Sequence, residues 1–131
     1  MKRTPINPWS WSQKFGYNQG EILEDTSRQL ICSGQTSVDA EGAPQHPEDM
    51  RSQMMLALSN LEAVLNAADM GLTNITRLTI YTTDVDDAMN NFDVLGAKLG
   101  AVGVSPPMSL LGITRLAIPE LMIEIEATAT D

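Results

Sequence analysis

The chain has 131 residues, 43% of them apolar, and a net charge of −9 at neutral pH. This composition excludes a transmembrane helix, because no apolar run reaches about 18 residues. The eight basic residues form no Lys/Arg cluster, which argues against nucleic-acid binding. We expect residues 1–131 to form a single domain. The basic start lacks the apolar segment of a secretory signal, and the lone Cys32 fits a reducing compartment, so we expect a cytoplasmic protein.

The N-terminal part predicts an irregular arm followed by two strands. Residues 1–15 contain two prolines and two tryptophans, and we expect these tryptophans to pack on the body of the domain. Strands are predicted over 16–23 and 29–33, and the polar residues between them favour a hairpin. The segment Ser33–Thr36 then ends the second strand at a glycine.

Two amphipathic helices flank a central strand in the predicted order. Pro47 opens the first helix, with Asp49 in its first turn, and apolar residues recur at threes and fours over 50–68. A strand follows over 75–83. The pattern then predicts one continuous second helix over about 84–99.

Two strands complete the chain, over 108–114 and 121–128. The last one alternates with period two, so that Glu124 and Glu126 share one face roughly 7 Å apart while the other face is apolar. Because a buried charge without a partner is costly, these carboxylates either are exposed to solvent or have a functional role.

The order ββαβαββ predicts an α+β fold with a mixed sheet and both helices on one face, since crossover connections are right-handed. The other face then has no helix to cover it. It should carry Thr79, Tyr81, Glu124 and Glu126, and this mixture suits a subunit interface better than open solvent. We expect no metal and no cofactor, because His46 is the only histidine and no cysteine cluster exists.

Four segments resemble, in order and spacing, the RidA/YjgF family, also known as L-PSP endoribonuclease-like proteins. They are Gly16–Gln19, Ser33–Thr36, Pro107 at the start of a strand, and Ile123–Ala129. The resemblance implies a chorismate-mutase-like fold and a homotrimeric barrel with the helices outside and ligand sites in clefts between subunits. It also implies hydrolysis of reactive enamines and imines, such as 2-aminoacrylate, to a keto acid and ammonia.

The resemblance implies site residues one by one. Glu124 corresponds to the glutamate that positions the attacking water, whereas Glu126 receives no role. Tyr17 corresponds to a pocket tyrosine, although the proline that usually precedes it is missing here. The implied substrate-binding positions are Tyr17, Ser33, Gly34, Asn91 (or Asn90), Met108, Ser109 and Leu110.

Met108 is the largest departure from the family pattern. It stands where archetypal imine deaminases have the arginine that binds the substrate carboxylate, and a methionine offers only a weakly accepting sulfur. Leu110 replaces a cysteine often found two positions later, so we expect a more apolar cleft. Neither Arg28 nor Arg115 lies at a position that indicates entry into this cleft.

Three functions stay open on the sequence. The first is a RidA-like hydrolase with an atypical substrate, and the second is a catalytically inactive trimeric protein that binds or senses a small molecule. The third, RNA cleavage, is disfavoured by the acidic chain. Each candidate also has a structural interpretation: Glu124 could pair at an interface, Ser33 and Gly34 could only form a turn, Tyr17 could only pack, and Asn91 could cap its helix.

Overall fold

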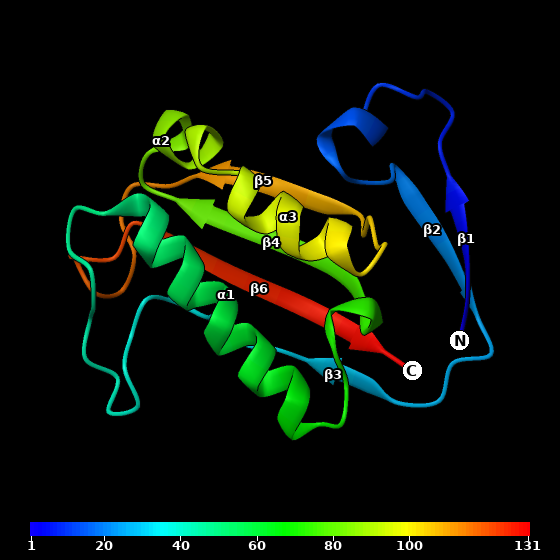
Figure 1. Ribbon diagram of the computed structural model, residues 1–131, viewed down its shortest axis with the longest axis horizontal. Coiled ribbons are helices and arrows are strands. Elements are labelled where there is room, and N and C mark those ends of the chain that lie inside the picture. Colours follow the sequence, from blue (N-terminus) through cyan, green and yellow to red (C-terminus); the bar gives the residue numbers. More distant parts are fainter.

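The computed structural model describes residues 1–131, which form an α+β fold with one main sheet (Figure 1). The strands are β1 (Lys2–Ile6), β2 (Gly20–Glu24), β3 (Gln29–Ile31), β4 (Ile75–Thr82), β5 (Met108–Gly112) and β6 (Ile123–Thr130). The α-helices are α1 (Met50–Ala67), α2 (Val85–Asn90) and α3 (Asp93–Ala101). Two 3₁₀ turns, Gln13–Phe15 and Leu72–Asn74, complete the set.

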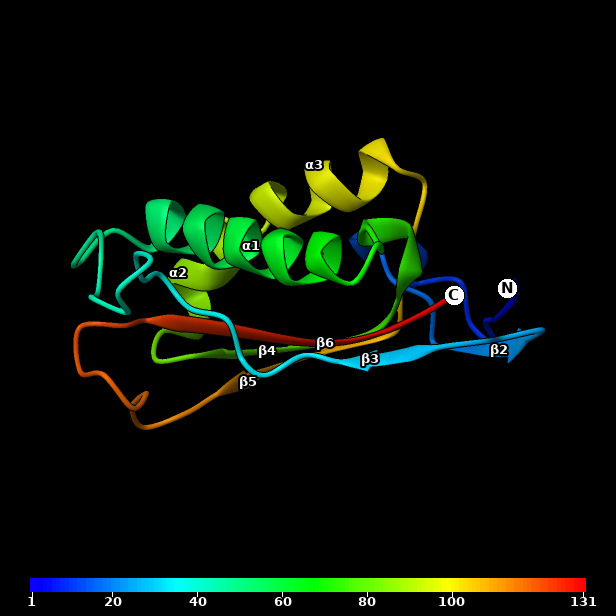
Figure 2. The same cartoon turned by 90° about the horizontal axis from the view of Figure 1, so that it is seen from below.

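The main sheet has the strand order β3-β6-β4-β5, with β4 and β5 parallel and the other pairs antiparallel. It is therefore mixed, as expected. All three helices lie on one face of this sheet, and the opposite face is bare (Figure 2). Thr79 pairs with Glu126 and Tyr81 with Glu124, so the four residues expected on the bare face do share it. We call it the helix-free face.

The hydrophobic core lies between the helices and the sheet. Alternate residues of β4 and β6 are buried, which places Leu78, Ile80, Ile123 and Ile125 under the helices. The periodic residues of α1 meet them from above, namely Met50, Met54, Ala57, Leu58, Leu61 and Leu65. No helix is both long enough and apolar enough to span a bilayer.

Both helical predictions need correction at their boundaries. The first helix begins at Met50, because Glu48 has a left-handed backbone (φ 61°) and Asp49 is the N-cap, accepting a 3.0 Å hydrogen bond from the Ser52 amide. The second helix is broken into α2 and α3. The break lies at Asn91, whose side-chain amide donates back to the Asp87 carbonyl and carboxylate at 2.9 and 3.2 Å.

The predicted N-terminal hairpin is wrong, and the first fifteen residues are not irregular throughout. β2 pairs with β1, antiparallel, in a sheet of its own, whereas β3 pairs with β6. β1 lies at an edge, which tolerates Pro5 because a missing amide donor costs nothing on the open side. The tryptophans do not pack on the body: Trp9 is 63% and Trp11 51% exposed.

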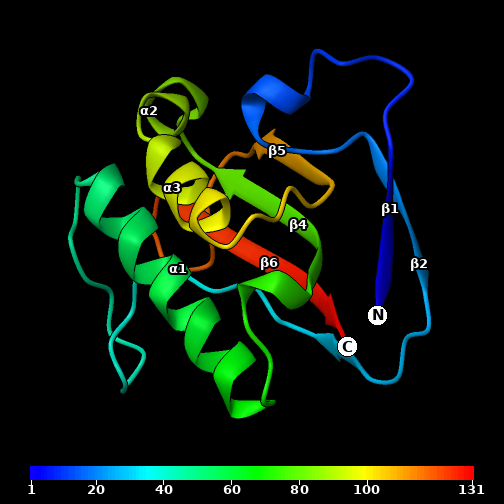
Figure 3. The ribbon, with the colours of Figure 1, turned by 45° about the vertical axis from the view of Figure 1, so that its right-hand side comes forward.

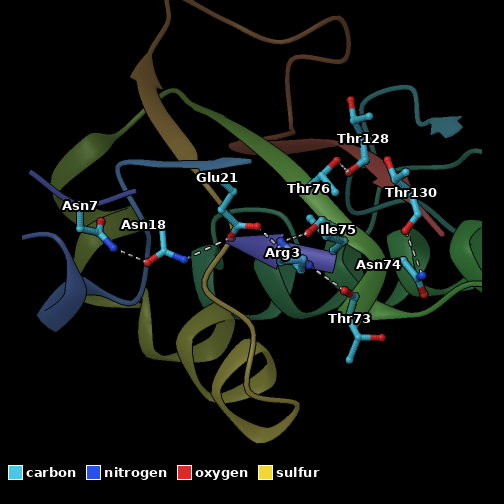
Figure 4. A network of polar contacts seen from close by, with 10 residues as sticks. All are labelled: Arg3, Asn7, Asn18, Glu21, Thr73, Asn74, Ile75, Thr76, Thr128 and Thr130. Atoms are coloured by element: carbon cyan, nitrogen blue, oxygen red, sulfur yellow. Dashed lines mark hydrogen bonds and ion pairs between the residues drawn. The ribbon is translucent and has the colours of Figure 1, made fainter. Parts of the chain in front are cut away.

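Arg3 connects the small β1–β2 sheet to the rest of the molecule (Figure 4). Its Nε donates to Glu21 Oε2 at 2.6 Å, and its two terminal nitrogens donate to the carbonyls of Thr73 and Ile75, both at 2.7 Å. Asn18 donates to the other Glu21 oxygen and accepts from Asn7. A two-stranded sheet is only marginally stable by itself. These bonds therefore hold β1, β2 and the segment between them against the rest of the molecule.

Replacing Arg3 by methionine should lower the free energy of unfolding by about 2 kcal/mol, because it strands the carboxylate of Glu21. The side chains of this pair are only 19% and 5% exposed. Lys2→Met is the matched control, since the Lys2–Glu24 pair is 65% and 51% exposed and should contribute no more than about 0.5 kcal/mol. Urea denaturation measures both variants, and equal midpoints would contradict the anchoring role.

Candidate functional site

A cleft of about 760 Å³ lies between the N-terminal segment, α2, α3 and β5. Figure 3 shows the blue 3₁₀ turn Gln13–Phe15 next to the orange strand β5. The N-terminal wall consists of Trp11, Gln13, Lys14, Phe15, Gly16 and Tyr17. The opposite wall consists of Met89, Phe92, Gly96, Met108 and Leu110. Three of the implied substrate-binding positions, Tyr17, Met108 and Leu110, therefore meet in one cavity.

Strand register explains why Met108 and Leu110 face this cleft. They pair with Leu78 and Ile80, which are buried under the helices, so their side chains lie on the helix-covered side of β5. Ser109 lies between them and faces the other way. Its hydroxyl accepts a 3.0 Å hydrogen bond from Arg77 on the helix-free face.

The N-terminal wall is shaped by a tight turn. Gly16 has a φ of 82°, a left-handed backbone that favours glycine, and its amide closes the turn on the Gln13 carbonyl at 3.0 Å. Tyr17 then meets Trp11 edge-on, with ring centroids 6.2 Å apart. The amide of Asn18 donates to the Ser105 carbonyl at 2.9 Å, which ties this wall to the loop before β5.

Glu124 lies on the helix-free face, half-buried, against Gly34. The backbone amides of Gln35 and Ile125 donate to each other's carbonyls at 2.8 and 2.9 Å, which brings the segment after β3 alongside β6. A Cβ added to Gly34 would lie 2.3 Å from Glu124 Oε1, 2.5 Å from Cδ and 2.7 Å from Cγ. Glycine at position 34 thus leaves the space that the Glu124 side chain occupies, and any larger residue there would force this carboxylate to move.

The two carboxylates of β6 differ in their partners. The Tyr81 hydroxyl donates to Glu126 Oε1 at 2.7 Å, whereas no side chain or amide of the chain donates to the Glu124 carboxylate. The hydrogen bond to Glu126 raises the pKa of the Tyr81 phenol, and partial burial and the charges of Glu126 and Glu124 raise it further. Glu126 therefore has a structural partner, and Glu124 is the carboxylate left free.

Glu126→Gln should lower the pKa of Tyr81 toward its ordinary value, since the amide removes the charge that opposes tyrosinate. Alkaline titration of tyrosinate absorbance measures this in a Tyr17→Phe background, where Tyr81 is the only tyrosine left. A raised folded pKa stabilises the protein below the unfolded pKa of about 10, and this contribution is lost as pH rises through the folded pKa. Identical titration curves for the two proteins would refute the pairing.

The remaining implied positions lie outside the cleft. Ser33 is exposed beside Gly34, and the Asn91 amide is engaged inside α2 rather than in the cleft lining. Neither alternative arginine enters it: Arg28 binds Asp131, and Arg115 donates to the carbonyls of Leu116 and Ala117. No group of three or more His, Cys, Asp or Glu side chains is arranged to hold a metal ion.

The implied site is thus divided between two faces of the sheet. Tyr17, Met108 and Leu110 line the cleft on the helix-covered side, at the edge strand β5. Glu124 and Gly34 lie on the helix-free face, two strands away from β5. One copy of the chain therefore does not bring the free carboxylate to its own cleft.

The sequence interpretation missed several cleft residues. Lys14 and Phe15 lie in the segment expected to be irregular, and Met89 and Phe92 lie in the predicted second helix, where only Asn91 (or Asn90) was implied as a site residue. The aromatic residues crowded between Trp9 and Tyr17 are the signal that could have identified this wall.

Comparison with known proteins identifies the family of the chain. The family model described as Endoribonuclease L-PSP matches residues 12–131. A 2-iminobutanoate/2-iminopropanoate deaminase of Escherichia coli K12 is 28% identical over 110 residues, which cover 80% of this chain and 81% of the deaminase. The Rid-family protein YyfB of Yersinia pestis, solved with its function unknown, is 34% identical with a TM-score of 0.83 over 98% of both chains. E. coli TdcF, solved with bound serine, is 27% identical with a TM-score of 0.71, covering 88% of this chain and 87% of its own. The chain belongs to the Endoribonuclease L-PSP family, which is the RidA/YjgF family.

Proposed function

We propose that the protein hydrolyses reactive imines and enamines to carbonyl compounds and ammonia, with Glu124 as the residue that activates water. The observation that carries this function is the free Glu124 carboxylate seated against Gly34. The sequence resemblance matches Glu124 to the water-positioning glutamate of the family. The E. coli deaminase, named for 2-iminobutanoate and 2-iminopropanoate, supports the reaction class.

The reaction needs one base and one water. The water oxygen bonds to the imine carbon while Glu124 accepts a water proton and delivers it to the nitrogen, which gives a carbinolamine. As the C–N bond breaks, the carbinolamine hydroxyl proton passes through Glu124 to the leaving nitrogen. Ammonia leaves and a carbonyl remains, so imine and water are converted into keto compound and ammonia with no redox change.

We propose that the site forms between copies in a homotrimer. A second copy is needed because Glu124 and the cleft lie on opposite faces of one chain's sheet. The helix-free face also exposes apolar side chains that such an assembly would bury, since Ile31 is 68% and Leu111 47% exposed. In a closed ring, the β5 edge of one copy adjoins the β3–β6 side of the next, which brings its Glu124 toward the cleft.

The substrate differs from those of the archetypes because Met108 cannot bind a carboxylate as an arginine does. The test is a panel of imines generated in place, with and without a carboxylate, in which ammonia and keto product are followed over time. We expect acceleration over buffer for at least one of them. No acceleration across the panel would overturn the hydrolase, and binding of keto acids without turnover would instead identify a trimeric binding protein.

A further inference from the structure

Lys14 is the only charged residue among those that line the cleft. It lies in the 3₁₀ turn Gln13–Phe15, across the cavity from Met108 and Leu110. The lining contains no aspartate or glutamate, although the chain as a whole carries a net charge of −9. Lys14 is therefore the one charged side chain that a ligand in this cleft would meet.

The Lys14 ammonium is also available to a ligand. It makes no ion pair with any carboxylate of the chain, unlike Lys2 and Lys98, which pair with Glu24 and Glu62. Its Nζ lies 5.2 Å from the ring centroid of Phe15, which lines the same cleft. A cation–π contact of this kind holds a lysine side chain in place without neutralising its charge.

The rest of the cleft is large and aromatic. Trp11, Phe15, Tyr17 and Phe92 contribute rings, and Trp11 and Phe15 are more than half exposed, so their apolar surfaces are open to a ligand. A volume of about 760 Å³ falls in the range of pockets that hold drug-sized ligands. Binding free energy from such apolar surfaces is greatest when the ligand carries a bulky apolar group that buries them.

We propose that Lys14 binds the substrate carboxylate in place of the missing arginine, and that the substrates are 2-imino acids with a large aromatic or branched apolar side chain. This inference rests on the proposed function, because the bound imino acid is a substrate only if the protein hydrolyses it. The same contacts hold the keto-acid product, since hydrolysis changes only C=N to C=O and leaves both the carboxylate and the side chain intact.

Calorimetric titration of the full-length protein tests the binding without turnover. The probes are 3-phenylpyruvate, pyruvate, which lacks the ring, and phenylacetone, which lacks the carboxylate. We expect 3-phenylpyruvate to bind at least about tenfold more tightly than either. Lys14→Met should weaken 3-phenylpyruvate by about tenfold and leave phenylacetone unchanged, and high salt should reduce the difference between the two proteins.

Two controls make the result specific. Lys98→Met removes a lysine from outside the cleft and should leave every titration unchanged, whereas Trp11→Ala should weaken 3-phenylpyruvate and phenylacetone alike. Wild-type affinity for 3-phenylpyruvate in Lys14→Met, equal affinities for pyruvate and 3-phenylpyruvate, or no binding of 3-phenylpyruvate would each overturn the inference. An absence of ammonia release would instead count against hydrolysis alone, because these titrations involve no reaction.

Discussion

Glu124→Gln is expected to lower kcat for imine hydrolysis by about 100- to 1,000-fold and to leave KM within about threefold. The amide keeps the size of the side chain and its seat against Gly34, but it cannot accept a proton from water. Because the carboxylate has no other partner in the chain, its loss leaves no stranded donor, and the melting temperature should stay the same.

Glu126→Gln is the matched control for this variant. It removes a carboxylate from the same face of the same strand, two residues away, whose oxygen accepts from Tyr81. Its kcat should remain within about threefold of wild type. Coupled measurement of ammonia separates the two cases, and equal losses in both variants would show that the general charge of the face matters rather than Glu124.

Gly34→Ala is expected to lower kcat by about 10- to 100-fold through Glu124 rather than through the fold. The new methyl group would lie 2.3 Å from Oε1, so the carboxylate must swing away, and misplacement by about 1 Å can cost two orders of magnitude. Only a partly exposed side chain has to move, so thermal unfolding should change little.

Gly100→Ala serves as the comparison for Gly34→Ala. Gly100 lies in α3, where an added Cβ meets nothing within 4 Å, so activity should be unchanged and the helix slightly more stable. Gly34→Ala with full activity would mean that the Glu124 rotamer seen here is not the one that works.

The main sheet follows from sequence patterns because each of its faces has a periodic signal. The alternation of β4 and β6 predicted both the core and the residues of the helix-free face, and the strand register confirms that Thr79, Tyr81, Glu124 and Glu126 share this face. The stripe of α1 was equally informative. The residue at which α1 begins could not be predicted in this way, because glutamate is common in the first turn of a helix, whereas Glu48 adopts a left-handed backbone.

The pairing of the N-terminal strands could not be predicted from sequence periodicity in the same way. β1 pairs with β2, and Arg3 of β1 donates both to Glu21 of β2 and to the carbonyls of Thr73 and Ile75, some 70 residues further along the chain. Such long-range bonds leave no local period. The cleft wall around Lys14 was missed because a short 3₁₀ turn between aromatic residues has no amphipathic pattern.

The division of the site between two faces was also beyond the sequence. Resemblance placed Glu124, Met108 and Leu110 in one set, and strand alternation alone showed only that neighbours within a strand diverge. The register of β5 with β4 is what places Met108 beneath the helices and Ser109 on the face of Glu124.

The most direct test of the shared site is subunit complementation. Gly96→Trp should fill the cleft, because Gly96 lines it and an added Cβ there meets nothing within 4 Å. Gly96→Trp and Glu124→Gln should each be inactive alone. Unfolded together in equal amounts and refolded, they should recover roughly a quarter of wild-type ammonia release, since random assembly pairs an intact cleft with an intact Glu124 at that frequency. No recovery from a mixed assembly would contradict a site built from two copies of the chain.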